Sequence, residues 1–315
     1  MNRSFRHVPV LFEAAVDSLR IDPHGVYVDC TGGGGGHSAA IASRLTDGRL
    51  LCIDRDPEAI AALNARFADQ PQVTVVQENF FHLKSILPAQ GIDAPDGILA
   101  DLGVSSHQLD APERGFSFHK DAPLDMRMSM SGRTAAEAVN SLGQAELQRI
   151  LSEYGEEKFA PAIARAIVRA RDAAPIETTL ALAQIVSDAV PAYARRDGHP
   201  ARKTFQALRI YVNGELDGLT EAVTDLFECL KVGGRVSVIT FHSLEDRAVK
   251  RAFAPLAVGC TCPRNFPVCV CGKQPRARLL KPVTPSAEEL ADNPRSRSAK
   301  LRTAERLAPK QISVI

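Results

Sequence analysis

The sequence has no tryptophan, few aromatic residues and no long hydrophobic run. Aromatic residues make up 5% of the 315 residues, and no apolar stretch approaches the roughly 20 residues that a membrane-spanning helix needs. The segment from Met1 to His7 lacks the apolar core of a signal peptide. The cysteines are scattered and odd in number, which favours reduced thiols. We therefore expect a cytoplasmic protein that does not contact a membrane.

The composition is otherwise that of a globular protein, with an uneven distribution of charge. Hydrophobic residues make up 45% and charged residues 24%, enough for a sizeable core in two domains or in one domain with an insertion. The formal net charge is only +1, but the segment from Arg264 to the end holds eleven Lys and Arg against four Asp and Glu. Such a basic tail is either a solvated surface or an edge that binds a polyanion.

A strand-like run, residues 26–31, leads into five consecutive glycines, Gly32 to Gly36, and then into His37 and a helical pattern. This order is typical of a loop that binds a nucleotide-type cofactor. A phosphate-binding P-loop needs Lys where His37 stands, and a dinucleotide G-x-G-x-x-G puts His37 or Ser38 at its third glycine. The spacing G-x-G-x-G fits Gly32, Gly34 and Gly36 and suits S-adenosylmethionine, which has no pyrophosphate. The alternative is a flexible surface turn.

Acidic residues fall toward the carboxyl ends of three predicted strands. They are Asp29 in residues 26–31, Asp54 in residues 49–54 and Asp101 in residues 98–104. Strands that alternate with helices predict a doubly wound, mostly parallel sheet, whose ligands bind beyond the strand carboxyl ends. Asp54 lies 20 positions beyond Gly34, the separation at which an acid reaches a ribose hydroxyl. Phe80, after a third strand at residues 73–76, is a candidate contact for the adenine, with core packing as the alternative.

Residues 106–203 contain no convincing strand and read as a helical insertion for substrate recognition. Thr134-x-x-Glu137 and Ser141-x-x-Gln144 resemble capping boxes that open helices. We expect residues 1–105 and 204–315 to form the two parts of the core. The second part carries a fifth strand at 235–241, a helix capped by Ser243-x-x-Asp246, and a final edge strand at 299–307.

Four cysteines form two C-x-C pairs, Cys260 with Cys262 and Cys269 with Cys271. Four thiols can hold zinc tetrahedrally, but each pair is spaced more tightly than the usual ligand gap. Reduced, half-buried cysteines are therefore the favoured interpretation, and the sequence predicts no metal site.

The longer motifs resemble one family over nearly the whole chain. They are HVPVL (7–11), DCTGGGGGHS (29–38), DLGVSSHQLD (101–110), RGFSF (114–118), PLDMRM (123–128), TFQALRIYVN (204–213), FHSLEDR (241–247) and NPRSRS (293–298). This chain resembles the bacterial 16S ribosomal RNA cytosine-N4 methyltransferases, and only the segment from Cys260 to Cys271 lies outside the shared pattern.

The resemblance implies a Rossmann-like class I methyltransferase with an inserted helical domain. It implies transfer of the methyl group of S-adenosylmethionine to the exocyclic N4 of one cytosine in the decoding centre of 16S rRNA, within the small ribosomal subunit. It suggests no protein partner. At matching positions, the cofactor of the family lies against Gly35, Gly36, His37, Asp54, Phe80, Asp101 and Gln108.

One departure concerns the target base. Amino-methyltransferases often grip the amine with Asp/Asn-Pro-Pro-aromatic, whereas this slot reads Asp101-Leu102-Gly103-Val104. We predict that Asp101 polarises N4 or positions the cofactor, and that another group stacks the base. Phe116, Phe118 and His242 are candidates, each with core packing as the alternative. A C5-methyltransferase is excluded because no Pro-Cys pair occurs.

Six basic residues in the insertion are expected, together with the basic tail, to hold RNA phosphates, although any one of them taken alone is better explained as a solvated surface residue: Arg165, Arg169, Arg195, Arg196, Arg202 and Lys203. Two other classes of function remain open. An NAD-linked oxidoreductase accounts for the glycine loop and Asp54 but not for the insertion or the basic tail. A ribosome-assembly factor without catalysis accounts for the basic surface.

Overall fold

The computed structural model describes residues 9–193, 198–263, 266 and 270–309. The chain divides into two compact units, one of residues 1–103 and 218–315 and the other of residues 104–217. The second boundary differs from the expected one at 203/204, because helix α10 (Arg202–Asn213) packs Phe205, Ala207 and Leu208 into the core of the second unit. His7, Val8, Arg195, Arg196 and Cys269 lie outside the described residues.

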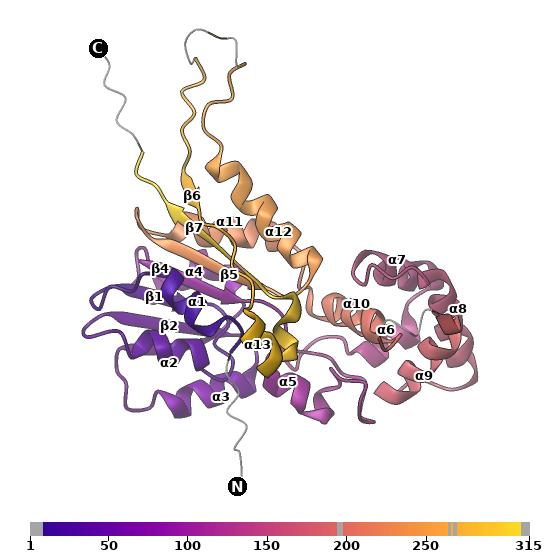
Figure 1. Cartoon of the computed structure of the whole chain (residues 1–315). Helices are drawn as coiled ribbons and strands as arrows, with labels where there is room; N and C mark the ends of the chain where they lie inside the picture. The colour runs from indigo at the N-terminus through magenta and orange to yellow at the C-terminus, as the bar shows by residue number, and fades with distance from the viewer. Residues whose placement is uncertain (1–8, 194–197, 264–265, 267–269, 310–315) are drawn as a thin grey trace, which may run out of the picture. The chain divides into compact units, whose positions relative to one another are not determined.

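The first unit is built on a 7-stranded sheet in the order β3-β2-β1-β4-β5-β7-β6 (Figure 1). Strands β1 to β5 are parallel, whereas β7 pairs antiparallel with both β5 and β6. The expected final edge strand is therefore internal, and the short β6 forms the edge. The strands are β1 Val26–Asp29, β2 Arg49–Asp54, β3 Val73–Gln77, β4 Gly97–Asp101, β5 Arg235–Thr240, β6 Ala277–Leu279 and β7 Lys300–Arg306.

Helices cover both faces of this sheet, as a doubly wound fold requires. On one face, apolar residues of α1 and α2 and Leu63 of α3 pack against Tyr27, Leu50 and Leu99 of the sheet. On the other face, α11 contacts α4 and α12. The helices of this unit are α1 Phe12–Ser18, α2 Gly36–Ala42, α3 Pro57–Arg66, α4 Leu83–Ala89, α11 Leu219–Cys229, α12 Ser243–Phe253 and α13 Ala287–Asp292, with 3-10 turns η1 Phe80–His82, η4 Ala254–Ala257 and η5 Pro294–Ser298.

Helix starts follow the capping chemistry of the sequence in some places and not in others. Asp56 caps α3 through a bond from the Glu58 N–H, and Pro57 occupies the first position of that helix. The predicted capping boxes at Ser141 and Ser243 are wrong. Ser141 ends its own helix, so α7 begins after Gly143, and α12 is capped one residue earlier than predicted, by His242.

The second unit is helical, as expected for the insertion, and among its described residues the only strand-like pairing is an isolated bridge between Pro123 and Thr178. Its helices are α5 Ser106–Asp110, α6 Ala135–Ser141, α7 Gln144–Glu153, α8 Ala160–Ala173, α9 Thr179–Ala189 and α10, with the 3-10 turn η2 Pro112–Arg114. The predicted box Thr134-x-x-Glu137 opens α6. Apolar residues at helical spacing build the core, including Leu147, Ile150 and Leu151 of α7, Ile163 and Ile167 of α8, and Leu182 and Val186 of α9.

Within the described ranges, no helix combines the length and apolar character that crossing a bilayer demands.

Candidate cofactor site

Three aspartates meet at the carboxyl edge of the parallel strands. Asp29 of β1 is in register with Cys52 of β2 and with Leu99 of β4. Asp54 and Asp101 stand two residues beyond those partners, at the ends of the same strands. Parallel strands end on a common edge, so the three carboxyl groups and the glycine loop lie together, as the sequence predicts.

The glycine loop is held to this edge by the Asp54 carboxylate. Gly33 donates its N–H to Asp54 Oδ2 at 2.8 Å, and Asp56 donates its N–H to Oδ1 at 2.9 Å. A carboxylate has about four acceptor positions, so two remain for further donors. Burial raises the pKa of Asp54. A diol is the kind of ligand group that fills two such acceptors without adding a charge.

Asp29 and Thr31 organise the other side of the loop. Ser38 donates its hydroxyl to Asp29 Oδ2 at 2.6 Å, and Thr31 donates its N–H to Oδ1 at 3.2 Å. Thr31 Oγ1 in turn accepts the N–H of Asp101 at 2.6 Å. These bonds join the ends of β1 and β4 to the start of α2, so the loop is fixed between Asp54 and Asp101.

Asp101 and His37 each carry one buried side-chain atom without a hydrogen-bond partner among the described residues. His37 Nδ1 lies 3.8 Å from Asp101 Oδ2, too far for a hydrogen bond. The Asp101 side chain is 23% exposed, yet its Oδ1 atom is buried. Neither that oxygen nor His37 Nε2 finds a hydrogen-bond partner in the described part of the protein. Buried polar atoms without partners are rare in proteins, and a bound ligand group or a water normally satisfies them.

The charges of this pair follow from burial. Burial lowers the pKa of His37 to about 4, so its imidazole is neutral at physiological pH. Burial, together with the carboxylates of Asp29 and Glu245, raises the pKa of Asp101 well above its ordinary value. Among the described residues, no charged Lys or Arg pairs with Asp101, so a positively charged or donor-bearing ligand group is what this carboxyl accepts best.

The glycines of the loop have different reasons for being glycine. Gly35 has a φ of +77°, and a Cβ at Gly36 would stand 2.5 Å from Pro9 Cγ, so the fold itself requires both. Gly34 has an ordinary φ, and a Cβ there would meet nothing within 4 Å. Neither backbone conformation nor packing within the protein requires glycine at position 34. A ligand bound close to the backbone would require it.

These features fit S-adenosylmethionine. Asp54 has spare acceptors for ribose hydroxyls, Asp101 has a buried oxygen without a partner in the described ranges, and the loop leaves room over Gly34. Phe80, which follows β3 as the first residue of η1, is partly buried, and its ring meets Phe81 edge-on with centroids 4.9 Å apart. An adenine contact by Phe80 remains a prediction.

The other predicted residues have structural partners of their own. Gln108 lies in the second unit, where its Oε1 accepts the Ser105 N–H at 3.0 Å and completes a capping box. Phe116 is buried in the core of that unit, and Phe118 stacks on His199 with ring centroids 4.4 Å apart. Core packing therefore accounts for both phenylalanines. The contact of Gln108 with the cofactor stays a prediction from the resemblance.

Two residues of this edge carry roles that the sequence did not reveal. Thr31 supports Asp101 by accepting its N–H, as described above. The position of Thr31 between the first strand and the glycines is the feature of the sequence from which this role could have been predicted. Glu245 Oε2 accepts the Phe241 N–H at 2.7 Å, and its charge helps to raise the pKa of Asp101. His242 Nε2 lies 3.0 Å from Glu245 Oε1 but outside hydrogen-bonding geometry, so His242 serves as the cap of α12.

The basic tail is partly neutralised inside the first unit. Glu305 pairs with Arg235 at 2.9 Å and with Arg278 at 2.7 Å, and Asp246 pairs with Lys300 and Arg302. Arg276 pairs with Glu228. The surplus of Lys and Arg counted from the sequence therefore overstates the charge that this segment offers to a polyanion.

Comparison with known proteins extends over nearly the whole chain. "Ribosomal RNA small subunit methyltransferase H" of Paenibacillus sp. (strain JDR-2) is 53% identical over 315 residues, covering 96% of this chain and 100% of that protein. The protein of the same name from Clostridium botulinum (strain Kyoto / Type A2) is 52% identical over 307 residues, covering 96% of this chain and 99% of that protein. A solved rRNA methylase from Streptococcus thermophilus aligns with a TM-score of 0.41 at 11% identity, covering 94% of each chain.

The sequence model of one protein family, described as the MraW methylase family, matches residues 4–307. That match covers the sheet, the glycine loop, the three strand-end aspartates and the helical unit. The chain belongs to the MraW methylase family and is a methyltransferase whose cofactor is S-adenosylmethionine.

Proposed function

We propose that this protein methylates the RNA of the small ribosomal subunit, at the exocyclic N4 of a cytosine in the decoding centre. Relatives at 53% and 52% identity are named as small-subunit ribosomal RNA methyltransferases and match this chain along almost their full length. The choice of N4 rests on the resemblance of the DLGVSSHQLD motif at 101–110 and on the acceptor that Asp101 offers.

The single observation that carries the proposal is the buried, unpartnered Oδ1 of Asp101 at the end of β4. A cytosine N4 is a weak nucleophile because its lone pair is delocalised into the ring. An acceptor that takes a hydrogen bond from an N4 proton makes that nitrogen more electron-rich. The sulfonium of S-adenosylmethionine supplies an already activated methyl group, so the chain's contribution is orientation, worth roughly 7–11 kcal/mol in favourable cases.

His37 contributes without carrying charge. Its imidazole stacks on Phe12 with ring centroids 5.7 Å apart, and its pKa of about 4 keeps it neutral. A neutral ring beside Asp101 avoids the ion pair that would otherwise satisfy the carboxylate. We infer that this arrangement keeps the Asp101 oxygen available for a cofactor or substrate donor.

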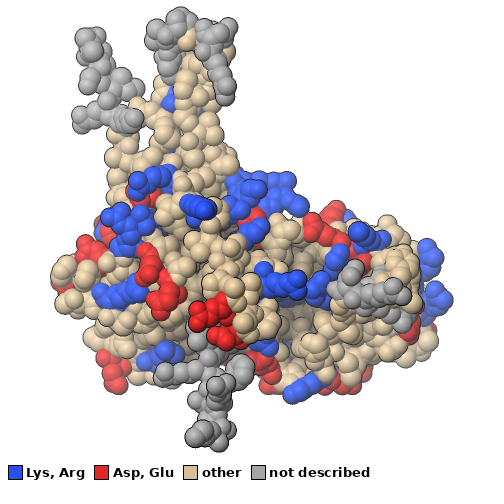
Figure 2. Space-filling view, in the orientation of Figure 1, with Lys and Arg blue, Asp and Glu red and all other residues tan. Residues whose placement is uncertain are grey.

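The helical unit and the basic side chains are proposed to hold the RNA. Arg165 and Arg169 are exposed on α8, and Arg202 is exposed at the start of α10. Lys203 donates to the Glu156 carbonyl at 2.9 Å and is therefore partly engaged. Lys and Arg side chains are spread over the face shown in Figure 2 and alternate with acidic ones. RNA phosphates would bind to several dispersed cations rather than to one continuous patch.

The test is mass spectrometry of 16S rRNA after incubation with methyl-labelled S-adenosylmethionine. Small subunits from a strain that lacks this methylation serve as one substrate, and naked 16S rRNA serves as the other. We expect label on N4 of one cytosine, and loss of that label with Asp101→Ala. Label on C5 or on a ribose oxygen would refute N4 chemistry, and the absence of label from both substrates would favour an assembly factor. Full methylation and normal cofactor affinity in Asp101→Ala would refute the role of Asp101.

A further inference from the structure

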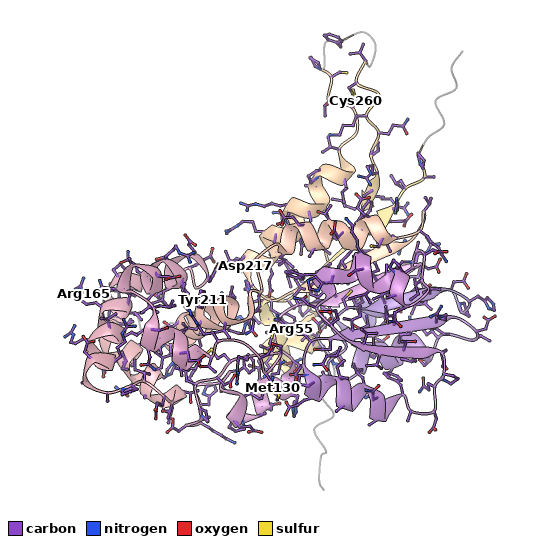
Figure 3. The ribbon with its side chains drawn as sticks, turned by 180° about the vertical axis from the view of Figure 1, so that it is seen from behind. Arg55, Met130, Arg165, Tyr211, Asp217 and Cys260 are labelled. Carbon is purple, nitrogen blue, oxygen red and sulfur yellow. The ribbon has the colours of Figure 1, made fainter. Side chains whose placement is uncertain are left out.

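A pair of chain segments, residues 258–263 and 270–276, forms the connection from η4 to β6. We call them the cysteine arms. Figure 3 shows Cys260 on a stretch that leaves the end of α12 and stands apart from the sheet. The arms are joined at their base, where Arg276 donates its N–H to the Leu256 carbonyl at 2.7 Å. Further out they contain neither helix nor strand in the described residues.

The cysteine arms have no hydrophobic core to hold them together. Val258 is 43% exposed and Val270 is 74% exposed, so their apolar side chains contribute little burial. A short segment without a core normally needs a disulfide or a metal ion to keep one conformation. The described cysteines of this segment, Cys260, Cys262 and Cys271, are thiols that form no disulfide with one another.

The three sulfur atoms nevertheless converge at the outer end of the arms. The Sγ atoms of Cys260, Cys262 and Cys271 all lie within 4.8 Å of one another, and those of Cys260 and Cys271 are 3.7 Å apart. A tetrahedral zinc with Zn–S bonds of about 2.3 Å places its sulfur ligands about 3.8 Å apart. The tight C-x-C spacing is therefore no obstacle, because the folded arms already bring the thiols to the separation that one ion requires.

Backbone amides are arranged as in a thiolate site. Cys262 donates its N–H to Cys260 Sγ, Val270 to Cys262 Sγ, and Thr261 to Cys271 Sγ, each at 3.4 Å. Each of the three sulfurs accepts a backbone hydrogen bond, which stabilises the charged thiolate form and orients it for a metal. Thiolate ligands in a tetrahedral array are typical of zinc and of iron–sulfur sites, and zinc needs no redox partner.

We propose that Cys260, Cys262 and Cys271 bind one Zn²⁺ ion, which clamps the cysteine arms together. Three thiolates leave one position of the tetrahedron for a further ligand. The proposed role of the ion is structural and not catalytic. It holds together the cysteine arms, which have no hydrophobic core of their own. The proposal stands independently of the RNA substrate, because its evidence is confined to the arms.

The first experiment measures metal content in tag-free protein purified under reducing conditions and then titrated with Zn²⁺. We expect about one tightly bound zinc per chain, and its loss in the double variant Cys260→Ser/Cys271→Ser. Cys229→Ser is the matched control, because Cys229 lies on α11 outside the arms, and this variant should keep the zinc. Zinc absent from the titrated wild type, or retained in the double variant, would overturn the proposal.

A second measurement uses only the wild type, so that misfolding of a variant cannot decide the outcome. A strong chelator should release the zinc, expose at least three additional thiols to a thiol reagent and accelerate tryptic cleavage after Lys273. Addition of Co²⁺ to the stripped protein should produce thiolate-to-cobalt charge-transfer absorption. An intact mass two hydrogens lighter and free of metal would identify a disulfide instead and refute the zinc site.

Discussion

Replacement of Asp101 by Asn should raise the folding stability of the cofactor-free protein and weaken its affinity for S-adenosylmethionine. In the free protein, Asp101 has a buried Oδ1 without a partner, and the carboxylates of Asp29 and Glu245 help to raise its pKa. Because the pKa is raised on folding, the unfolded chain ionises more readily. The group therefore costs folding free energy at neutral pH, and this cost disappears as the pH falls toward the ordinary value of 3.8.

The size of the gain depends on how far burial and the two neighbouring carboxylates disfavour the ionised form of Asp101. The side chain is 23% exposed, and solvent screening keeps the gain small. We expect Asn, which has nearly the same volume and does not titrate, to gain about 1 kcal/mol at pH 7. For a chain of this length, that gain raises the melting temperature by about 2 °C.

The assay compares melting temperatures at pH 7 and near pH 4, without cofactor, and cofactor affinity by calorimetry. The gain should be present at pH 7 and absent near pH 4. In the complex, the positive sulfonium favours the ionised form of Asp101, so loss of this carboxylate should weaken S-adenosylmethionine binding by about 1.5–3 kcal/mol, roughly 10- to 100-fold. Asp188→Asn is the control: the exposed Asp188 carboxylate lies on α9 and accepts a hydrogen bond from the Gln184 side chain, so neither quantity should change. A lower melting temperature at pH 7 together with unchanged affinity would refute the reasoning.

Three further outcomes are expected. Gly34→Ala should leave the melting temperature within about 1 °C of the wild type, because the backbone of Gly34 is ordinary and the added Cβ meets open space. The same variant should bind S-adenosylmethionine more weakly in calorimetry, and undiminished affinity would contradict a cofactor beside Gly34. His37 has a pKa of about 4 in the folded protein against 6.5 ordinarily, so the unfolded chain takes up its proton first, and folding stability should fall by up to about 3 kcal/mol as the pH drops from about 6.5 to 4. Thermal melts of His37→Gln should show a smaller loss over that range, and identical pH curves would argue against the buried neutral imidazole. RNA methylation should fall steeply between 50 and 200 mM salt in a filter assay, whereas a flat response would argue against phosphate contacts.

Features that depend only on neighbours along the chain can be predicted from the amino-acid sequence of this protein. The passage from β1 through the glycines into α2 follows from a strand-favouring run, residues that allow a tight turn and a helical repeat. Asp29, Asp54 and Asp101 were placed at strand ends by the same local reasoning, and parallel pairing then brings those ends to one edge. The motifs also identified the family, which the match over residues 4–307 confirms.

Other properties arise from groups that are far apart in the sequence and meet only in the folded protein. The raised pKa of Asp101 comes from burial and from Asp29 and Glu245, which reach the site from other elements. The tail loses much of its apparent charge because Glu228, Asp246 and Glu305 pair with its basic residues. Local pattern records neither burial nor charge pairing, because both arise only when the chain is folded. The same is true of the three thiols, whose sulfur atoms meet because the two arms run side by side.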